Sequence, residues 1–160
     1  MQLALRWQEP SDSWRARSID RSDVPALGAL MLAAYRGTVD DEGETEADAV
    51  AEIERTLSGE YGPFQADCSF AVDEGPRVLG GSMISLWEGE PILTFVVVHP
   101  DVKRRGLGTF LLATSGNALV SAGYAHLDLF VTEENEPAVS LYRRLGFQLV
   151  DRLTDPSLES

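Results

Sequence analysis

Apolar residues recur along this chain at two different spacings, which separate the expected helices from the expected strands. A spacing of three or four residues is typical of an amphipathic helix and predicts four helices. The first begins at Ser22 or Asp23 and ends at Gly37, and the second begins near Thr45. The last two are expected over about residues 106–122 and 137–145.

Short runs of mostly apolar residues predict the strands. They cover residues 14–19, 68–72, 78–87, 92–98, 127–131 and 147–153, and residues 2–7 could add one more. Turn signals separate the three middle runs, which indicates an antiparallel meander. The strands on either side of the third helix should be parallel, because a helical crossover normally joins parallel neighbours.

The resulting element order is β-α-α-β-β-β-α-β-α-β. It predicts a mixed α/β fold with helices on both faces of a central, mostly antiparallel sheet. No internal repeat, low-complexity tract or long linker interrupts the pattern, and 160 residues suit one hydrophobic core. We therefore expect a single domain over residues 1–160.

Acidic residues outnumber basic ones by 26 to 13, which gives a net charge of −13. Such a chain repels polyanions unless its cations are gathered in one place, so no nucleic-acid partner is expected. The only lysine is Lys103, and Arg104 and Arg105 follow it directly. This group suggests a local anion site, although composition alone favours a chance surface cluster.

The sequence gives no sign of a membrane segment or of disulfide chemistry. No apolar run approaches the length of a transmembrane span, and the first residues lack a signal-peptide pattern. The single cysteine, Cys68, lies in an apolar stretch typical of a buried thiol. A cytoplasmic location without a membrane partner is the simplest expectation.

The most informative segment covers residues 92–109, where a predicted strand leads through a turn into a helix that begins with two glycines. A helix N-terminus offers unpaired N–H groups and partial positive charge, which together bind phosphate. Glycines leave room for a ligand, and a threonine hydroxyl can add a donor. The segment predicts a diphosphate cradle made of Lys103, Arg104, Arg105, Gly106, Leu107, Gly108 and Thr109.

Two better-known phosphate-binding motifs do not fit this segment. A dinucleotide-binding fingerprint needs a third glycine where Leu111 stands, and a Walker loop needs a Gly-Lys-Ser/Thr sequence that the chain lacks. On spacing alone, an ordinary strand–helix turn with exposed cations is an equal alternative.

A second motif further along the chain favours the cradle. Val98-x-Pro100 and Lys103-x-x-Gly106-x-Gly108 are followed by Asn135-x-x-Ala138-x-x-Leu141-Tyr142-x-x-Leu145-Gly146-Phe147. In this order and at this separation, the motifs resemble the acetyl-CoA motif and the C-terminal motif of the GNAT superfamily of N-acyltransferases. Lys103 departs from the Gln or Arg usual in the family, but a lysine still supplies a point charge.

The resemblance implies acetyl-CoA as the acyl donor, no metal, and a sheet that splays between its fourth and fifth strands. The pantetheine arm would lie in that gap and pair with the backbones of Val96, Val97 and Val98. Asn135 would help to position the cofactor, although it also suits the N-cap of the last helix.

Tyr142 is the catalytic residue that the resemblance implies. It would protonate the departing CoA thiolate as an amine attacks the thioester, and its alternative role is to pack the helix on the sheet. The resemblance does not identify the general base. Many family members have an acidic residue at the position of Thr94, where a threonine can only order a water, and Glu88 or Glu90 could act through water.

The resemblance places the acceptor site among the first two helices, their connecting loop and the turn at 87–90. The expected acceptor contacts are Tyr35, Trp87 and Glu88, together with Thr94 on the following strand. The acidic loop residues Asp40, Asp41, Glu42 and Glu44 would attract a cationic amine, but they equally suit a solvated loop.

These features predict an N-acetyltransferase that moves the acetyl group of acetyl-CoA directly to a primary amine of a small molecule or peptide. The alternatives are a catalytically weak acyl-CoA-binding regulatory module and a different nucleotide-binding α/β protein. Only 13 residues follow Phe147, whereas the family usually has two strands there. The missing strand is absent, replaced by residues 2–7, or supplied by a partner, which would make a homodimer.

Overall fold

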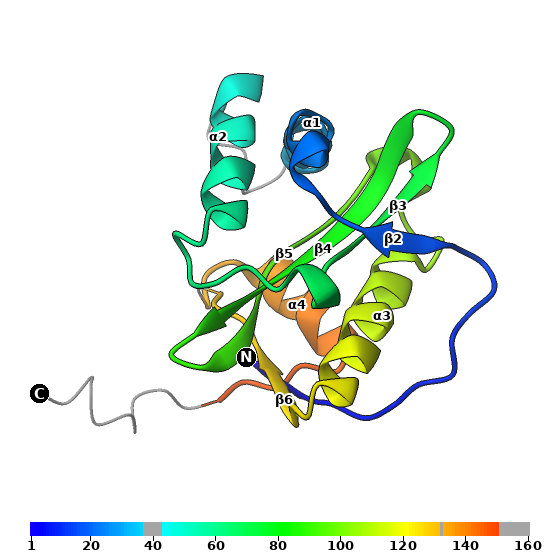
Figure 1. Cartoon of the computed structure of the whole chain (residues 1–160), viewed down its shortest axis with the longest axis vertical. Coiled ribbons are helices and arrows are strands. Elements are labelled where there is room, and N and C mark those ends of the chain that lie inside the picture. The colour runs from blue at the N-terminus through cyan, green and yellow to red at the C-terminus, as the bar shows by residue number, and fades with distance from the viewer. Residues whose placement is uncertain (37–42, 132, 151–160) are drawn as a thin grey trace, which may run out of the picture.

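The computed structural model describes residues 1–36, 43–131 and 133–150, which form one layered α/β unit (Figure 1). The strands are β1 (Gln2–Ala4), β2 (Ala16–Ser18), β3 (Phe70–Glu74), β4 (Arg77–Trp87), β5 (Glu90–Val98) and β6 (His126–Asp128). The helices are α1 (Val24–Tyr35), α2 (Glu46–Leu57), α3 (Leu107–Ser121) and α4 (Glu136–Arg144), with short 3-10 turns at Arg21–Asp23, Ala66–Cys68 and Pro100–Val102. The predicted fold class is confirmed.

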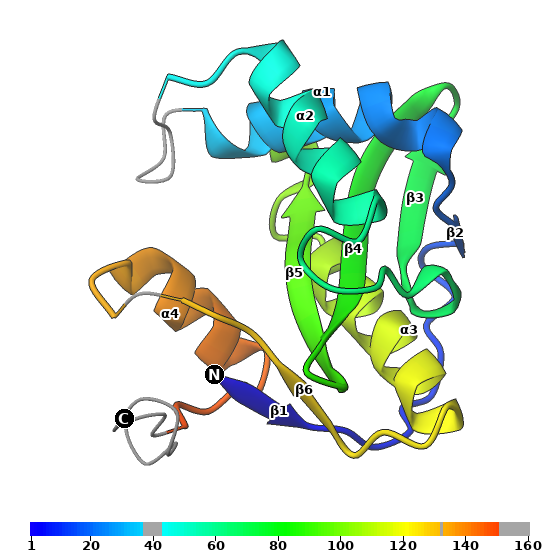
Figure 2. The same ribbon diagram turned by 60° about the vertical axis from the view of Figure 1, so that its left-hand side comes forward.

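The strands form one sheet in the order β1-β6-β5-β4-β3-β2. All neighbours are antiparallel except β5 and β6, which are parallel as the crossover through α3 requires. The β5–β6 ladder consists of one residue pair, Ile92 with Asp128. Beyond this pair the two strands diverge toward α4, as Figure 2 shows, so the predicted splay is present.

Strand β4 lies at the centre of the molecule, and two glycines let helices approach both of its faces. A Cβ on Gly80 would lie 2.9 Å from side-chain atoms of Leu107 and Leu111, whereas a Cβ on Gly81 would lie 3.2 Å from Leu27 of α1. Consecutive strand residues point to opposite faces, so α3 and α1 cover opposite sides of the sheet. The first turn of α3 is therefore held tightly against β4.

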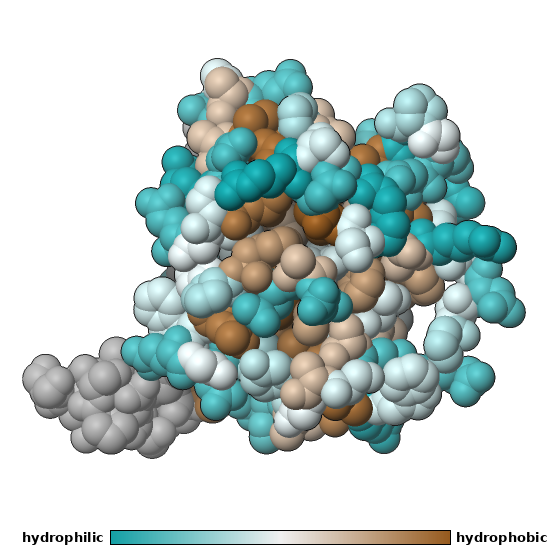
Figure 3. All heavy atoms as spheres, in the orientation of Figure 1, coloured by the Kyte–Doolittle hydropathy of each residue, from teal (hydrophilic) through white to brown (hydrophobic). Residues whose placement is uncertain are grey.

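Apolar side chains fill the space between these layers in three clusters. One, around Leu27, Ile53 and Met83, joins α1 and α2 to the sheet. A second, around Leu79, Leu107 and Leu111, holds the start of α3. The third joins β1, β6 and α4 and includes Leu127, Leu129 and Phe147. On the face drawn in Figure 3, hydrophilic residues surround a smaller hydrophobic area in the middle.

Strand β1 takes the place in the sheet of the strand that is missing after Phe147. It pairs with β6 on one side, and on the other Gln2 and Gln148 exchange two backbone hydrogen bonds of 2.8 Å. Met1 continues the β6 pairing, because its amine donates to Leu129 O and its carbonyl accepts from Leu129 N. Of the three alternatives, the arrangement is the one in which the N-terminal segment replaces the missing strand, with Gln2–Ala4 as the strand itself.

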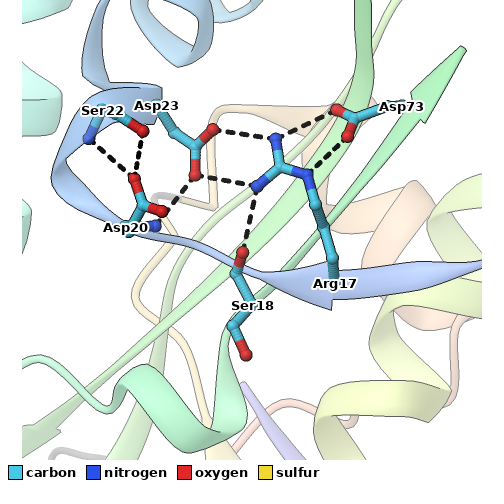
Figure 4. Close-up of polar contacts among 6 residues, drawn as sticks. All are labelled: Arg17, Ser18, Asp20, Ser22, Asp23 and Asp73. Carbon is cyan, nitrogen blue, oxygen red and sulfur yellow. Dashed lines mark hydrogen bonds and ion pairs between the residues drawn. The ribbon is translucent and has the colours of Figure 1, made fainter. Parts of the chain in front are cut away.

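An arginine joins three elements at the other edge of the sheet (Figure 4). Arg17 of β2 donates to both carboxylate oxygens of Asp23, at 2.9 and 2.8 Å, and to Asp73 of β3. These hydrogen bonds hold the pKa of Asp23 below its ordinary value, although burial of the carboxyl opposes the shift. The Arg17 cluster, defined as these three residues, ties β2 to β3 and to the start of α1.

Several element boundaries differ from the expected ones. The strand expected at 127–131 is the short β6, because β5 diverges beyond Asp128. Asp23 makes no side-chain cap at α1; instead Asp20 caps the 3-10 turn before it. The second helix begins near Thr45 as predicted, and Thr45 caps α2 in a reciprocal capping box with Asp48. In the described part of the strand expected at 147–153, only Gln148 forms a bridge, to Gln2, so no strand forms there. Residues 151–153 and the expected helix end at Gly37 lie outside the described residues.

Candidate active site

The start of α3 presents backbone N–H groups that the protein itself does not use. No side chain caps this helix, and within the described residues no group accepts from the N–H of Leu107, Gly108 or Thr109. Gly106, the N-cap residue, has a φ of +80°, a left-handed conformation that glycine adopts without strain. Arg104 has a φ of +66°, which is strained for a residue with a side chain, and such strain is common at ligand sites.

Space for a ligand lies in front of these amides. A Cβ built on Gly106 would meet nothing within 4 Å, and one on Gly108 would meet only Val98, at 3.7 Å. The segment is therefore open where a diphosphate has to approach, and its donors match phosphate oxygens. The residues fit such a group.

Cations surround the same turn without being neutralised by the protein. In the described part of the chain, Lys103, Arg104 and Arg105 take part in no ion pair, and all three are exposed. The guanidinium of Arg105 lies over the ring of Trp14, 5.5 Å from its centroid. The cradle, defined as residues 103–109, thus combines free amides with unneutralised charge.

The strand that leads to the cradle has an irregular ladder. Met83 pairs with Phe95 and Ile84 pairs with Leu93, so Thr94 is an extra residue in β5 and forms a bulge. Val96, Val97 and Val98 follow the bulge and pair with β4, but no strand of the described chain pairs with their other edge. Their side chains contribute to the core clusters, whereas their backbone groups on the open edge are the ones that an extended ligand could pair with.

Tyr142 was expected as the catalytic acid and Asn135 as a cofactor contact, each with a structural alternative. Both make the contacts of that structural alternative. Tyr142 is half-buried on α4, with its ring edge-on to Phe147 at a centroid distance of 5.8 Å. The side-chain oxygen of Asn135 accepts a hydrogen bond from Ala138 N at 3.3 Å and so caps α4. These contacts fix the positions of both residues, and their roles toward a cofactor stay predictions.

The expected acceptor residues come from three different elements. Tyr35 is half-buried at the end of α1, against the core that α1 and α2 share. Trp87 and Glu88 lie at the β4–β5 turn, where Trp87 is 47% exposed. Glu88 and Gly89 both have positive φ, typical of a two-residue hairpin turn. The expected loop residues Asp40, Asp41 and Glu42 lie outside the described residues.

Thr94 is the one expected acceptor residue with a defined polar partner. Its hydroxyl donates to Ser85 Oγ at 3.2 Å, and Ser85 is fully buried. This pair places two hydroxyls at the bulge, where β5 and β6 begin to part. Two hydroxyls offer both donor and acceptor capacity, which is what a bound water requires.

A cavity of about 100 Å³ adjoins the cradle, and no sequence motif predicts it. Its lining includes Thr109 of the cradle, Arg6 from the segment after β1, and Arg144 at the end of α4. These residues are far apart in the sequence and share no motif. Only the placement of β1 beside β6 brings them together.

Other candidate groups in the chain point to no additional chemistry. Cys68 is a buried thiol, as predicted, and burial raises its pKa, which disfavours the reactive thiolate. In residues 1–36, 43–131 and 133–150, no cluster of three His, Cys, Asp or Glu residues has the arrangement of a metal site. No helix of that part is long and apolar enough to cross a membrane.

Comparisons with known proteins identify the family of the chain. A model of the acetyltransferase (GNAT) family matches residues 30–147. The chain is 35% identical over 136 residues to a mycothiol acetyltransferase of Clavibacter sepedonicus, covering 81% of this chain and 40% of that protein. It is 32% identical over 104 residues to the ribosomal protein bS18 alanine N-acetyltransferase of Salmonella typhimurium, covering 65% and 69%. The chain thus spans less than half the length of the mycothiol enzyme.

Solved structures show the same fold. The ribosomal-protein-S18-alanine N-acetyltransferase of Escherichia coli superimposes with a TM-score of 0.64 at 24% identity, covering 85% of this chain and 78% of that one. The PaiA N-acetyltransferase of Thermoplasma acidophilum, solved in complex with coenzyme A, gives 0.62 at 18% identity, with coverages of 87% and 92%.

Proposed function

Since this chain belongs to the acetyltransferase (GNAT) family, we propose that it transfers the acetyl group of acetyl-CoA directly to a primary amine of a small molecule or peptide. The observation that carries the proposal is the uncapped start of α3, where the N–H groups of Leu107, Gly108 and Thr109 have no acceptor in the described protein. Unpaired amides beside unneutralised cations are suited to the diphosphate of an acyl-CoA.

Each expected residue then has a distinct task. Acetyl-CoA supplies an activated thioester, and the cradle holds its diphosphate. The open edge of β5 at Val96–Val98 offers backbone donors and acceptors to the amides of the pantetheine arm. Tyr142 donates its phenolic proton to the sulfur as the thiolate leaves. Holding thioester and amine together supplies the rest of the acceleration.

The acceptor is proposed only as a class. One relative is named for mycothiol and another for the alanine of a ribosomal protein, so family membership alone does not separate small molecules from peptides. Because an amine is mostly protonated at neutral pH, it has to lose a proton before it attacks. A water held by Thr94 and Ser85 is the proposed route for that proton, with Trp87, Glu88 and Tyr35 as acceptor contacts.

Release of free thiol from acetyl-CoA, measured with a panel of amino sugars, polyamines and peptides with free N-termini, tests the proposal. We expect thiol release with at least one amine. Measurable CoA binding without release from any amine would instead favour a regulatory acyl-CoA-binding module.

Tyr142→Phe tests the assignment of the acid. The variant keeps the ring contact with Phe147, so we expect kcat to fall by about 100-fold while the CoA dissociation constant changes less than about twofold. Tyr124→Phe is the matched control, because Tyr124 packs on the same cluster and has no proposed role. Unchanged turnover in Tyr142→Phe would remove Tyr142 from its role and leave the acyl transfer itself standing.

A further inference from the structure

The cavity next to the cradle combines an apolar floor with a cationic rim. Residues of α3, of the segment after β1 and of the α4 end line it, and several of them are buried or half-buried, namely Leu3, Leu5, Leu112, Ala113, Gly116 and Leu145. Arg6 and Arg144 are exposed members of the lining. Thr109 belongs both to the cavity lining and to the cradle, so the cavity lies next to the diphosphate-binding turn.

Neither arginine has a partner in the described structure. Arg6 and Arg144 make no hydrogen bond and no ion pair there, whereas Arg17, Arg55 and Arg77 each pair with a carboxylate. Acidic residues outnumber basic ones two to one in this chain, so partners are plentiful. The negative end of the α4 dipole accounts for a cation at Arg144 but not for Arg6.

The fold fixes the segment that carries Arg6. Leu5 N donates to Ala125 O at 2.8 Å, and the side chain of Asn117 bonds both backbone groups of Gln8, at 2.9 and 2.8 Å. The backbone of Arg6 therefore lies between two anchored residues. Arg144 lies in the last turn of α4, which Phe147 and Leu145 anchor to the core.

We propose that this cavity takes the 3′-phosphate of the acyl-CoA, held between Arg6 and Arg144. The inference rests on the proposed function. Coenzyme A carries a phosphate monoester on the ribose beside its diphosphate, so a site for that group has to lie within one nucleoside of the cradle. A guanidinium binds phosphate through two parallel hydrogen bonds. At about 100 Å³ the cavity is smaller than the roughly 300–1,000 Å³ of ordinary small-molecule pockets, which suits a phosphate group better than a whole nucleoside.

A second hollow on the other flank of the cradle is less suitable for this group. It is lined by Arg15 and Arg105 but also by Asp12, Asp73 and Glu74, so its charged lining residues sum to −1. A net negative lining does not favour a phosphate monoester, which carries a charge of about −1.5 to −2 at neutral pH. The cavity at Arg6 and Arg144 has no acidic residue in its lining.

Calorimetric titration with CoA and with 3′-dephospho-CoA tests the assignment on the full chain. We expect the wild type to bind dephospho-CoA about 100-fold more weakly than CoA, and Arg6→Gln and Arg144→Gln each to weaken CoA binding by about tenfold. Neither variant should alter binding of dephospho-CoA, because the lost partner is absent from that ligand. Arg143→Gln is the matched control, since Arg143 is the neighbouring cation on α4 but does not line the cavity.

Two results would overturn the assignment and leave the proposed function intact. One is equal affinity of the wild type for CoA and dephospho-CoA. The other is a loss in Arg6→Gln and Arg144→Gln that is the same for both ligands, or that Arg143→Gln reproduces. If the wild type bound neither ligand, the proposed function would fail as well. Both substituted arginines are exposed, so thermal unfolding should show no loss of the fold.

Discussion

The Arg17 cluster pairs its one cationic side chain with carboxylates, whereas the described protein leaves the three cationic side chains of the cradle unneutralised. Arg17 donates to two carboxylates, and one of these, Asp23, has a side chain only 11% exposed. In the cradle, Lys103, Arg104 and Arg105 have no carboxylate partner in the described chain, and the nearby amides of α3 have no acceptor.

The difference separates groups that stabilise the fold from groups that are available to bind a ligand. A buried polar group without a partner costs free energy, so folded proteins satisfy such groups unless a ligand or water does so. In this acidic chain, a cation that pairs stabilises the chain itself, and a cation left beside unused amides marks an anion site. The following substitutions should therefore affect either stability or CoA binding, but not both.

The largest expected effect comes from Gly108→Glu. It should weaken CoA binding by at least about 100-fold, because it places bulk and negative charge among the phosphate-binding amides. The fold should persist, since the new Cβ has room and an acidic residue is favourable in the first turn of a helix. Calorimetry with CoA measures the loss.

Ser121→Glu is the matched control for this substitution, because it adds the same charge at the opposite end of α3. It should leave CoA affinity nearly unchanged. Wild-type affinity in Gly108→Glu would show that the cradle does not bind the diphosphate.

Arg17→Met should act on stability alone. It leaves the mostly buried Asp23 without its partner, and we expect a loss of about 2 kcal/mol in the free energy of unfolding, measured by denaturant titration. The figure is below that for a fully buried pair because the Arg17 side chain is 38% exposed. CoA affinity should stay within about twofold. A large loss of CoA affinity with unchanged stability would show that Arg17 acts on ligand binding rather than on the fold.

The pH dependence of stability sharpens the role of Asp23. Its folded-state pKa is lowered, so the pairing contributes fully above the ordinary carboxyl pKa of about 3.9 and is lost as pH falls through the lowered value. Asp23→Asn should therefore cost about 1 kcal/mol at pH 7, and the difference from wild type should shrink below about pH 4. A difference that is constant with pH would mean that the charge of Asp23 does not contribute.

Lys103→Gln should give the smallest effect, and it should change CoA binding but not stability. One exposed point charge near a phosphate contributes little, so we expect CoA affinity to fall about threefold at low salt and less at high salt. The free energy of unfolding should change by less than about 0.5 kcal/mol. A measurable loss of stability would show that Lys103 has a structural partner.

The sequence predicted the parts of the molecule whose signals are local. The cradle is contiguous, so its glycines and cations were visible in one short segment, and the start of the second helix near Thr45 was visible for the same reason. Helical periodicity located α3 and α4 to within about one residue.

Features that depend on distant partners were not predictable in the same way. Strand β1 has only three residues, and its place beside β6 depends on pairing with residues at the other end of the chain. The bulge at Thr94 follows from the register between β4 and β5, which no composition signal reveals. The cavity with Arg6 and Arg144 exists only once β1, α3 and α4 meet.

Isothermal titration of the unmodified chain with coenzyme A and acetyl-CoA tests the central claim most directly. The account predicts one saturable site for each ligand, with a dissociation constant between about 1 μM and 1 mM that rises with salt concentration. The absence of any heat from either ligand across that range would contradict the assignment of residues 103–109 as a diphosphate cradle.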